Sequence, residues 1–572
     1  MPLRLPLGTS DFAKIRRDGS TYVDKTGMIG DVIRGSALVT LLPRPRRFGK
    51  TVNLSMLKGW FERPVASIPG ASESLRALFD GLEVATAGPD VAARFQRHPV
   101  IFLTFKDVKC DTWQASRQAL LGLVQAEVAR HATVWGGAAI LAPERKILED
   151  LAAGNGTALH EGLRVLSQAL HTATGEECVI LIDEYDTPIH EGWLHGYFDE
   201  VVGLFRNLLA GGLKDNSSLY RGVLTGILRV AKESMFSGLN NIAVYSLLAP
   251  EYSTRFGFTP AEVEALCALA GSSADMAGIR EWYNGYVMGG QVVYNPWSVI
   301  RYLDSMDKVF RPYWVNTASN DILRDLLIRS GPRVQFELGE LIAGRGIVRA
   351  VSEDIQLRDL KGNTGALWSF LLFSGYLKAQ DVQVVDGRTI ATLSVPNREV
   401  ISSYQGIFRD WMEQGLGGSE DVSDLCRAVL SGDAATFGAG LQRLVLQSLS
   451  FFDTGAKTPE AVYQSFLVGL LVQLNMTHTV DTNRESGFGR YDVCIKPRVD
   501  FVGSRAGAVM ELKSIDTDAE PPETSDSALT SAMKQIKERE YAVTLRATGA
   551  DPVWLWAVVF DGKRVRVRVE KG

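Results

Sequence analysis

Short apolar runs alternate, in the first 250 residues, with longer stretches whose apolar residues recur at helical spacing. The runs suited to buried strands occupy residues 38–42, 99–105, 179–182 and 219–225, and the stretches with helical spacing occupy 113–131 and 140–172. Strands that alternate with helices predict a mostly parallel sheet covered on both faces. Ligands of such sheets bind at the carboxyl ends of the strands.

The first apolar run leads into a basic loop that suits phosphate binding. Residues 43–48 are followed by Gly49, Lys50 and Thr51, which open a segment with helical spacing. Backbone N–H groups at a helix N-terminus cradle phosphate oxygens, while the lysine reaches the β- and γ-phosphates and the threonine hydroxyl holds Mg²⁺. The usual G-x-x-x-x-G-K-[ST] spacing has glycine where this chain has Arg44, so the same letters also fit a basic turn before an ordinary helix.

A second motif follows the third apolar run, where residues 179–182 continue into Asp183 and Glu184. A strand that ends in two carboxylates is typical of a Walker B segment, in which one acid faces Mg²⁺ and the next orients or deprotonates the attacking water. We predict Asp183 as the Mg²⁺ residue, together with Thr51, and Glu184 as the water-activating residue. Two acids can also follow a strand in an ordinary turn. A nucleotide site is favoured here because this pair comes after the basic loop in the chain.

The runs TYVDKTGMI and RPRRFGKTVNLSML, residues 21–29 and 44–57, resemble the bacterial and archaeal AAA-ATPase-like family. In that family a phosphate loop with arginines in place of the early glycine is the usual form. The resemblance implies ATP as the ligand and places residues 21–29 beside its pocket. The loop residues expected at the nucleotide are Arg46, Arg47, Phe48, Gly49, Lys50 and Thr51.

The resemblance also extends to residues on either side of the loop. Thr225 takes the position of a polar sensor of the γ-phosphate, and Arg229 is a candidate for stabilising phosphate charge in its own site or in that of a neighbour, which is compatible with a homo-oligomer. Arg229 fits a surface helix arginine equally well. We expect Asp24 and Lys25 to form a surface turn, with Thr26 as the N-cap of the helix that follows.

Residues 251–414 combine turn-rich aromatic segments with helix starts, and we predict a helical lid or winged-helix-like region there. Thr259 and Asn295, each followed by proline, are predicted N-caps, and a short hairpin precedes Asn295. Three aromatic residues could stack on nucleic-acid bases, although aromatic residues at such density are more often core. They are Trp282, Tyr283 and Tyr286.

A second constellation lies near the C-terminus. Asp492 stands in an alternating, strand-like run, and Glu511 and Lys513 lie two residues apart on one face of a second predicted strand. Two carboxylates can hold Mg²⁺ or Mn²⁺ against a scissile phosphate, while the ammonium orients water or stabilises the developing charge. Acids and a lysine at this spacing are frequent by chance, and a cross-strand salt bridge on a solvated face is the alternative.

The runs NRESGFGRYD and MELK, with the helix that carries Gln535 and Tyr541, resemble the PD-(D/E)XK nuclease domain that accompanies this ATPase family. The resemblance implies nucleic acid as the substrate, with DNA favoured over RNA, and a catalytic set of Asp492, Glu511, Lys513 and Gln535. Family members tend to have histidine where this chain has Gln464. Further candidate acids are Glu460 and Glu485, and the acidic loop 516–526 is predicted as a flexible insertion.

Composition limits the remaining function classes. Apolar residues make up 46% and charged residues 22% of the chain, and the net charge is −5, so nucleic-acid binding requires local basic surface. Arg564, Arg566 and Arg568 alternate with valines, which predicts a half-buried edge strand with a solvated basic face rather than a dedicated DNA contact.

Secretion and membrane insertion are not predicted. The N-terminus lacks the apolar segment of a signal peptide, and no apolar run reaches the length of a membrane span, so we expect a cytoplasmic protein without a membrane partner. The five cysteines form no CxxC pair and the seven histidines are dispersed, which disfavours a disulfide framework and a zinc site. Cys178 and Cys494 are expected in the core.

The sequence therefore predicts an α/β protein with four parts. They are a P-loop ATPase domain with a parallel sheet (1–250), a lid or winged-helix-like region (251–414), a helical linker (415–455) and an α/β restriction-endonuclease-like domain (456–572). Our hypothesis is that ATP gates or powers metal-dependent cleavage of nucleic acid. The alternative is a signalling or assembly switch whose nuclease-like domain only binds, and a role in defence or in a mobile element would leave the chemistry unchanged.

Overall fold

The computed structural model describes residues 4–64, 75–228, 241–271, 274–314, 332–342, 344–355, 357–360, 364–404, 406, 419–448, 467, 470–471, 474, 477–482, 485–486, 489–498, 503–515, 524–562 and 564–572. Four predicted features lie outside them: Arg229, Glu460, Gln464 and residues 516–523 of the acidic loop. The chain divides into two units, which we treat separately. The first comprises Met1–Thr317 and Val348–Glu399, and the second comprises Ala318–Ile347 and Val400–Gly572.

A parallel five-stranded sheet organises the first unit. Its strands are β1 (Val39–Pro43), β2 (Val100–Thr104), β3 (Cys178–Asp183), β4 (Leu219–Gly226) and β5 (Ile242–Val244), in the order β2-β3-β4-β1-β5. All four strand pairs are parallel. In this register Leu42 lies opposite Thr225, and Thr104 lies opposite Asp183. The predicted parallel sheet is confirmed, and the carboxyl ends of its strands bring the two motifs to one edge.

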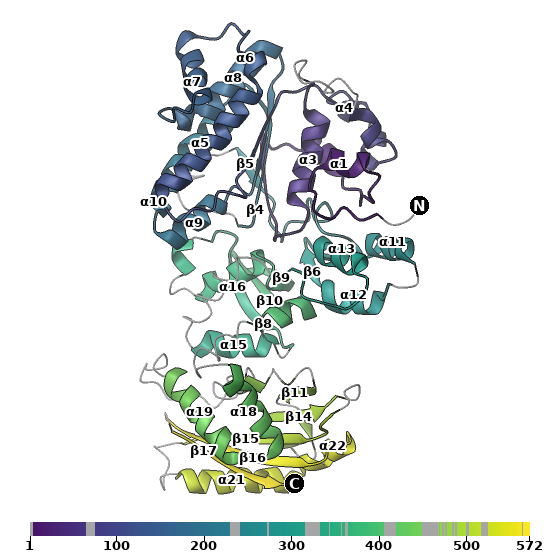
Figure 1. Ribbon diagram of the computed structural model, residues 1–572, viewed down its shortest axis with the longest axis vertical. Coiled ribbons are helices and arrows are strands. Elements are labelled where there is room, and N and C mark those ends of the chain that lie inside the picture. The colour runs from purple at the N-terminus through teal and green to yellow at the C-terminus, as the bar shows by residue number, and fades with distance from the viewer. Residues whose placement is uncertain are drawn as a thin grey trace. The chain divides into compact units, whose positions relative to one another are not determined.

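Helices cover both faces of this sheet, as Figure 1 shows. One face carries α5 (Trp113–Arg130), α8 (Gly162–Thr174) and α10 (Phe198–Leu213), and the other carries α3 (Lys50–Phe61), against which α1 (Phe12–Arg17) packs. The remaining elements are α2 (Gly27–Arg34), η1 (Leu75–Phe79), η2 (Glu83–Thr86), α4 (Pro89–Ala92), α6 (Ala132–Trp135), α7 (Ala142–Ala152), η3 (Leu159–Glu161) and α9 (Thr187–His195). The helices over predicted ranges 113–131 and 140–172 are confirmed.

The first unit also contains a region of mixed structure after β5. Its helices are α11 (Pro260–Ala270), α12 (Met276–Tyr283), α13 (Pro296–Asp304), η4 (Leu357–Leu360) and α16 (Thr364–Phe373), and β6 (Tyr286–Met288) forms a hairpin with β7 (Gln291–Val293). A three-stranded sheet has the order β8-β10-β9, with β8 (Ile347–Val351), β9 (Lys378–Val385) and β10 (Arg388–Ser394). Thr259 closes a capping box and Asn295 caps α13, as predicted. Tyr283 and Tyr286 are buried core residues, so they are not exposed for base stacking.

The second unit is built on a mixed sheet in the order β11-β14-β15-β16-β17. The strands are β11 (His478–Thr482), β14 (Val493–Pro497), β15 (Gly507–Ser514), β16 (Val553–Asp561) and β17 (Arg564–Lys571), and only β15 and β16 pair in parallel. A short ladder joins β12 (Glu485–Ser486) to β13 (Gly489–Arg490). The helices are α15 (Pro332–Ile342), α18 (Ser419–Ser431), α19 (Ala434–Ser448), α21 (Ser525–Glu538) and α22 (Tyr541–Ala547).

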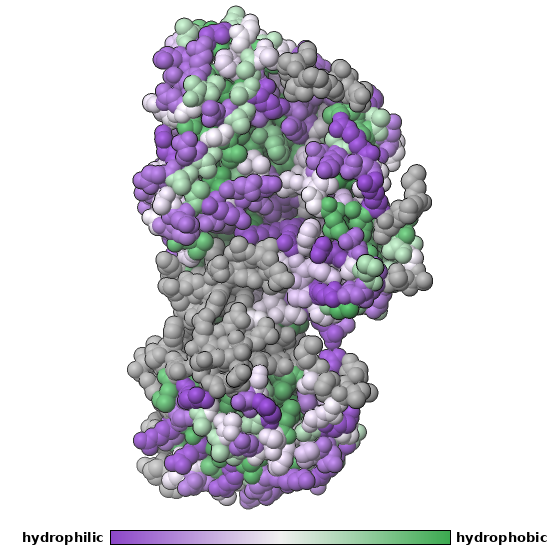
Figure 2. Space-filling view, viewed as in Figure 1, coloured by the Kyte–Doolittle hydropathy of each residue, from purple (hydrophilic) through white to green (hydrophobic). Residues whose placement is uncertain are grey.

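Alternating side chains of β16 divide the core of this unit into two layers. Trp554 and Trp556 donate their indole N–H groups to carbonyls near the end of α18. Leu555 and Ala557 instead pack in the cluster that contains α21. The range predicted as a helical linker thus supplies α18 to the core of this unit. On the face drawn in Figure 2, hydrophilic and hydrophobic residues intermingle over its described surface.

The basic C-terminal strand lies at the edge of the sheet, as predicted. Val565 is buried while Arg564 and Arg566 are exposed, and Arg568 donates to the Thr530 hydroxyl of α21. Cys178 and Cys494 are buried, which confirms them as core residues. No helix among the described residues has the length and apolar character required to cross a membrane.

Candidate active sites

The loop between β1 and α3 is held from both sides. The Arg44 N–H donates to the Gly226 carbonyl at the end of β4 (2.9 Å), and the Gly257 N–H donates to the Phe48 carbonyl (3.3 Å). Phe48 is buried with its ring against Tyr286. Gly49 precedes the helix with φ = 85°, a left-handed conformation in which a side chain would be strained. The motif therefore requires glycine here on conformational grounds, independently of any ligand.

Lys50, Thr51, Asp183 and Thr225 converge at the edge of the sheet. The Thr51 hydroxyl donates to Asp183 Oδ2 (2.6 Å), and the Thr225 hydroxyl donates to Asp183 Oδ1 (2.7 Å). The Lys50 ammonium donates to the carbonyls of Arg44 and Pro45 (3.1 Å each). Burial lowers the pKa of Lys50, and the carboxylates of Glu184 and Asp183 oppose that shift. A buried ammonium whose partners among the described residues are carbonyls is suited to an anionic ligand.

Arg44 replaces the early glycine of the usual loop with a fully buried side chain. Its Nη1 donates to the carbonyls of Pro43 and Tyr245, and its guanidinium lies over the Phe256 ring. Burial lowers the pKa of Arg44 to about 9. This arginine therefore anchors the loop against neighbouring segments and does not line the cavity described below.

Glu184 follows β3 with φ = 49°, which turns the chain sharply after Asp183. Two residues later, Asp186 is buried and accepts N–H bonds from Ile227 (2.7 Å) and Leu228 (3.0 Å). Asp186 thereby fixes the segment after β4, a role that the sequence analysis missed. Asp186 is the third acid of the run Asp183-Glu184-Tyr185-Asp186, and this could have indicated the role. The N–H groups that donate to Asp186, however, lie more than forty residues away in the chain.

A cavity of about 400 Å³ opens beside the loop. Its lining includes the loop residues Arg47, Gly49, Lys50 and Thr51, together with Glu184. The lining also includes many apolar and aromatic side chains, among them Leu5, Pro6, Tyr22, Val23, Leu266, Pro296, Trp297 and Ile300. A cavity that combines cations and helix N-terminal N–H groups with apolar walls suits a ligand that joins phosphates to a flat ring. Residues 21–29 were predicted beside the nucleotide pocket, and four of them, Thr21, Tyr22, Val23 and Lys25, line this cavity.

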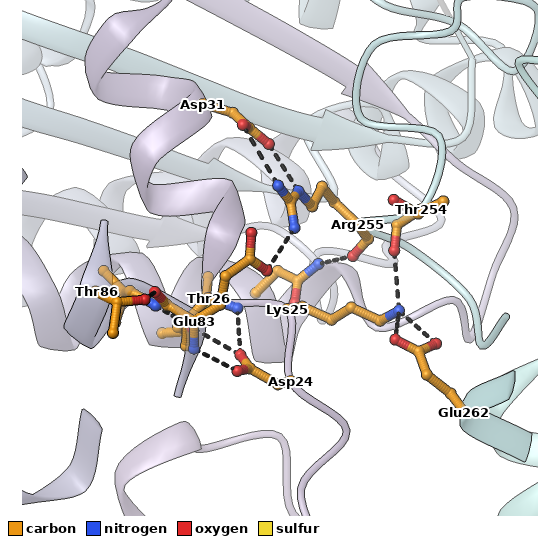
Figure 3. Close-up of polar contacts among 12 residues, drawn as sticks. Asp24, Lys25, Thr26, Asp31, Glu83, Thr86, Thr254, Arg255 and Glu262 are labelled. Carbon is orange, nitrogen blue, oxygen red and sulfur yellow. Dashed lines mark hydrogen bonds and ion pairs between the residues drawn. The ribbon is translucent and has the colours of Figure 1, made fainter. Parts of the chain in front are cut away.

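The expectation of a surface turn at Asp24 and Lys25 is wrong. Lys25 is only 6% exposed, and its ammonium pairs with Glu262 of α11 (2.7 Å) and donates to the Thr254 carbonyl, as Figure 3 shows. Asp24 accepts bonds from the Thr26 hydroxyl (2.6 Å) and the Glu83 N–H (2.6 Å). Thr26 occupies the N-cap position of α2 without a capping bond.

Arg255 extends this network to α2. It pairs with Asp31 (2.7 Å) and Glu83 (2.9 Å), as Figure 3 shows. Its carbonyl accepts a bond from Asn53 of α3 (2.8 Å). Because Lys25 and Arg255 also line the cavity, these ion pairs join its walls from segments more than 170 residues apart.

The loop also contacts Tyr313 and Trp314, which lie shortly before the unit boundary at Thr317, and Trp314 in turn contacts Glu399 at the second boundary. Trp314 Nε1 donates to the Arg46 carbonyl (3.1 Å), and its backbone N–H donates to Glu399 Oε1 (2.7 Å). Arg47 donates to the Tyr313 carbonyl and lies over the Trp297 ring (4.6 Å). Glu399 is fully buried, and burial raises its pKa to about 7.

In the second unit, β14, β15 and α21 bring the predicted catalytic set together. The Leu512 N–H donates to Asp492 Oδ2 (2.7 Å), which holds the Asp492 carboxylate beside β15. Lys513 Nζ lies 3.4 Å from Glu511 Oε1, and Gln535 Nε2 donates to the same oxygen. The predicted shared face of Glu511 and Lys513 is thus confirmed, and it faces α21.

The surroundings of the two carboxyls disfavour their ionised forms. Burial and the neighbouring Asp492 raise the pKa of Glu511 to about 8, with Lys513 opposing, and burial raises the pKa of Asp492. Glu511 is 2% exposed, and its Oε2 is buried with no hydrogen-bond partner among the residues that the structure describes. An orphaned buried carboxylate oxygen beside a second acid fits a hard divalent cation. The described residues contain no cluster of three or more potential ligands, so this site rests on a pair of acids.

Comparison with known proteins agrees with this division of the chain. Residues 6–236 match the family model described as predicted AAA-ATPase, and residues 458–570 match that of the PD-(D/E)XK nuclease superfamily. The chain is also 28% identical, over 571 residues, to a protein of Azotobacter chroococcum mcd 1 described as "Uncharacterized protein in vnfD 5'region". That alignment covers 98% of this chain and 96% of the other protein, so the similarity spans both units.

Proposed function

Because the chain joins an AAA-ATPase-like domain to a PD-(D/E)XK nuclease-superfamily domain, we propose that it is an ATPase whose nucleotide cycle gates or powers metal-dependent cleavage of nucleic acid. The observation that carries the proposal is that each domain brings its own candidate catalytic residues close together. Thr51 and Asp183 meet at one sheet edge, and Asp492, Glu511 and Lys513 meet in the other unit.

In the nucleotide half, ATP would place its phosphates at the N-terminus of α3 and its base against apolar side chains that line the cavity. Lys50 would exchange its carbonyl partners for phosphate oxygens. Thr51 and Asp183 would hold Mg²⁺, which stabilises negative charge on the phosphates. Glu184, which lines the cavity, would orient or deprotonate water, and Thr225 keeps Asp183 in position. A contact of Thr225 with the γ-phosphate stays a prediction.

In the nuclease half, Asp492 and Glu511 would hold Mg²⁺ or Mn²⁺. When bound, the cation polarises the scissile phosphate and acidifies a water. Gln535 fixes one oxygen of Glu511, which leaves the orphaned Oε2 for the cation. Lys513 can stabilise the charge that develops on the phosphate, and DNA is the substrate we favour.

Support for coupling comes from the contacts of Trp314 and Glu399. The chain passes from the first unit to the second after Thr317 and again after Glu399. Trp314 lies three residues before the first passage and contacts both the phosphate loop and Glu399. A change in the loop on binding ATP would therefore act directly on Trp314 and, through Trp314, on Glu399, so it would reach both passages.

The nucleotide half is tested with a fluorescent ATP analogue and with phosphate release in Mg²⁺. Lys50→Ala should weaken binding at least about tenfold, because it removes charge-assisted hydrogen bonds to phosphate. Glu184→Gln should keep binding but lower turnover by about 100-fold or more. Lys58→Ala is the matched control, since Lys58 lies on the same helix and pairs with Glu62. Equal binding by Lys50→Ala and Lys58→Ala would contradict the assignment.

The nuclease half is tested by incubating labelled DNA and RNA with Mg²⁺ or Mn²⁺. Glu511→Ala and Lys513→Ala should each abolish cleavage. Glu538→Ala removes an exposed acid from α21 and should leave cleavage unchanged. Cleavage by Glu511→Ala at the rate of Glu538→Ala would refute the assignment of this site.

A further inference from the structure

A second cation lies beside the acidic pair of the C-terminal unit. Arg539 follows the last residue of α21 and stands four positions after Gln535, so the two side chains share a face of the helix. Gln535 contacts Glu511 directly. Arg539 must therefore project on the side of α21 that faces the acids.

A tyrosine pair fixes the direction of this arginine. Arg539 Nη1 donates to the Tyr541 hydroxyl (3.1 Å), and Tyr541 is buried with its ring edge-to-face against Tyr491 (6.0 Å between centroids). Tyr491 immediately precedes Asp492 in the chain. Arg539 thus contacts a tyrosine that packs against the neighbour of one acid, and it follows the helix that contacts the other acid.

The electrostatics agree with this placement. Burial is the largest influence on both carboxyls and raises their pKa values, while the charge of Arg539 acts in the opposite direction on Asp492 and on Glu511. Lys513 has the same effect, but its ammonium is already paired with Glu511 Oε1. Arg539 is half-buried, and one of its nitrogens is used by Tyr541. A planar guanidinium fixed at one nitrogen can present its remaining donors to two oxygens of a phosphate.

We propose that Arg539 binds a backbone phosphate of the nucleic-acid substrate and positions the scissile bond at the Asp492–Glu511 pair, with Tyr541 holding the guanidinium in place. This inference rests on the proposed nuclease function. The inference adds to that function a residue that attracts a polyanion toward two acids, in a chain whose net charge is −5. A phosphate contact of this kind positions the substrate without reading its sequence.

The test measures binding and cleavage separately. Thirty-nucleotide single- and double-stranded DNA and RNA carrying a fluorophore are titrated by anisotropy in EDTA, where no cleavage occurs, at several salt concentrations. Arg539→Ala should raise Kd roughly tenfold and reduce the slope of log Kd against log salt by about 0.7–0.9, the value of one phosphate contact. In Mn²⁺, KM should rise, because the contact that positions the substrate is lost.

Matched variants separate this role from a structural one. Lys534→Ala removes a cation from α21 whose side chain is 70% exposed and paired with Glu538, and it should leave both Kd and the salt slope unchanged. Arg539→Lys should restore the salt slope but not all of the turnover, because an ammonium lacks the bidentate geometry. Tyr541→Phe should lower turnover with the salt slope intact.

Two results would contradict the inference in different ways. If the wild type cleaves nucleic acid and Arg539→Ala matches Lys534→Ala in Kd, KM and salt slope, then Arg539 contacts no phosphate while the nuclease function stands. If the wild type neither binds nor cleaves any of the four probes, the proposed nuclease function fails and the inference fails with it.

Discussion

The affinity of the C-terminal acidic pair for a divalent cation is expected to depend steeply on pH. Burial and the Asp492 carboxylate raise the pKa of Glu511 to about 8, from an ordinary value of 4.5. At pH 6 the metal-free protein therefore keeps Glu511 protonated. A cation binds the carboxylate form, so it must displace this proton, and affinity rises as pH increases toward the pKa.

The size of the effect follows from the ionised fraction of Glu511. With the pKa of Glu511 near 8, about 1% of the carboxyl is ionised at pH 6 and half of it at pH 8. The apparent Kd for Mn²⁺ should fall roughly 50-fold between pH 6 and pH 8, and by no more than about twofold between pH 8 and pH 9. An exposed glutamate with an ordinary pKa would give almost no change over this range.

Electron paramagnetic resonance of unbound Mn²⁺ measures this affinity directly. The titration compares the wild type with Glu511→Gln, which keeps the shape of the side chain but removes its charge. Glu538→Gln serves as the control because it neutralises an exposed acid on α21. A flat pH profile in the wild type, or Mn²⁺ binding by Glu511→Gln equal to that of the control, would refute the assignment of Glu511 as a metal ligand.

Three further predictions concern the first unit. Thr51→Val should weaken Mg²⁺-ATP binding about tenfold with little effect on ATP binding in EDTA, because the hydroxyl is assigned to the metal; equal losses in both conditions would contradict that role. Lys25→Met should destabilise the unit by about 3 kcal/mol in calorimetry because it leaves Glu262 partly buried and unpaired, and adding Glu262→Gln should recover part of the loss. Trp314→Phe removes the donor to the Arg46 carbonyl. It should leave the Kd for ATP within about threefold but reduce the effect of ATP on cleavage. An unchanged effect of ATP on cleavage would contradict the proposed coupling route.

Local sequence patterns predicted much of the fold and many of the residues that lie together at the two candidate sites. The capping box at Thr259 and the cap at Asn295 depend on residues within one helical turn, so the chain itself specifies them. The order of strand, loop and helix around Gly49 is equally local. Glu511 and Lys513 share a face because side chains alternate along a strand. Such features need no knowledge of distant partners.

Features that depend on distant partners were missed or misjudged. The Lys25–Glu262 pair joins residues 237 positions apart, so nothing near Lys25 distinguishes a buried cation from a surface turn. The same holds for Trp314 and Glu399, which are 85 positions apart. Asp186 was overlooked because its N–H donors follow a different strand. Burial and charge pairing across the fold decide these roles, and a periodic pattern does not encode them.

The central claim is tested most directly by one cleavage experiment. Single- and double-stranded DNA and RNA are incubated with Mg²⁺ or Mn²⁺, with and without ATP, and with the wild type, Lys50→Ala or Glu511→Ala. The account predicts cleavage by the wild type that changes with ATP, loss of cleavage in Glu511→Ala, and loss of the ATP effect in Lys50→Ala. Absence of cleavage under every condition, with ATP hydrolysis intact, would contradict the account and leave an ATP-dependent switch whose C-terminal acids are structural.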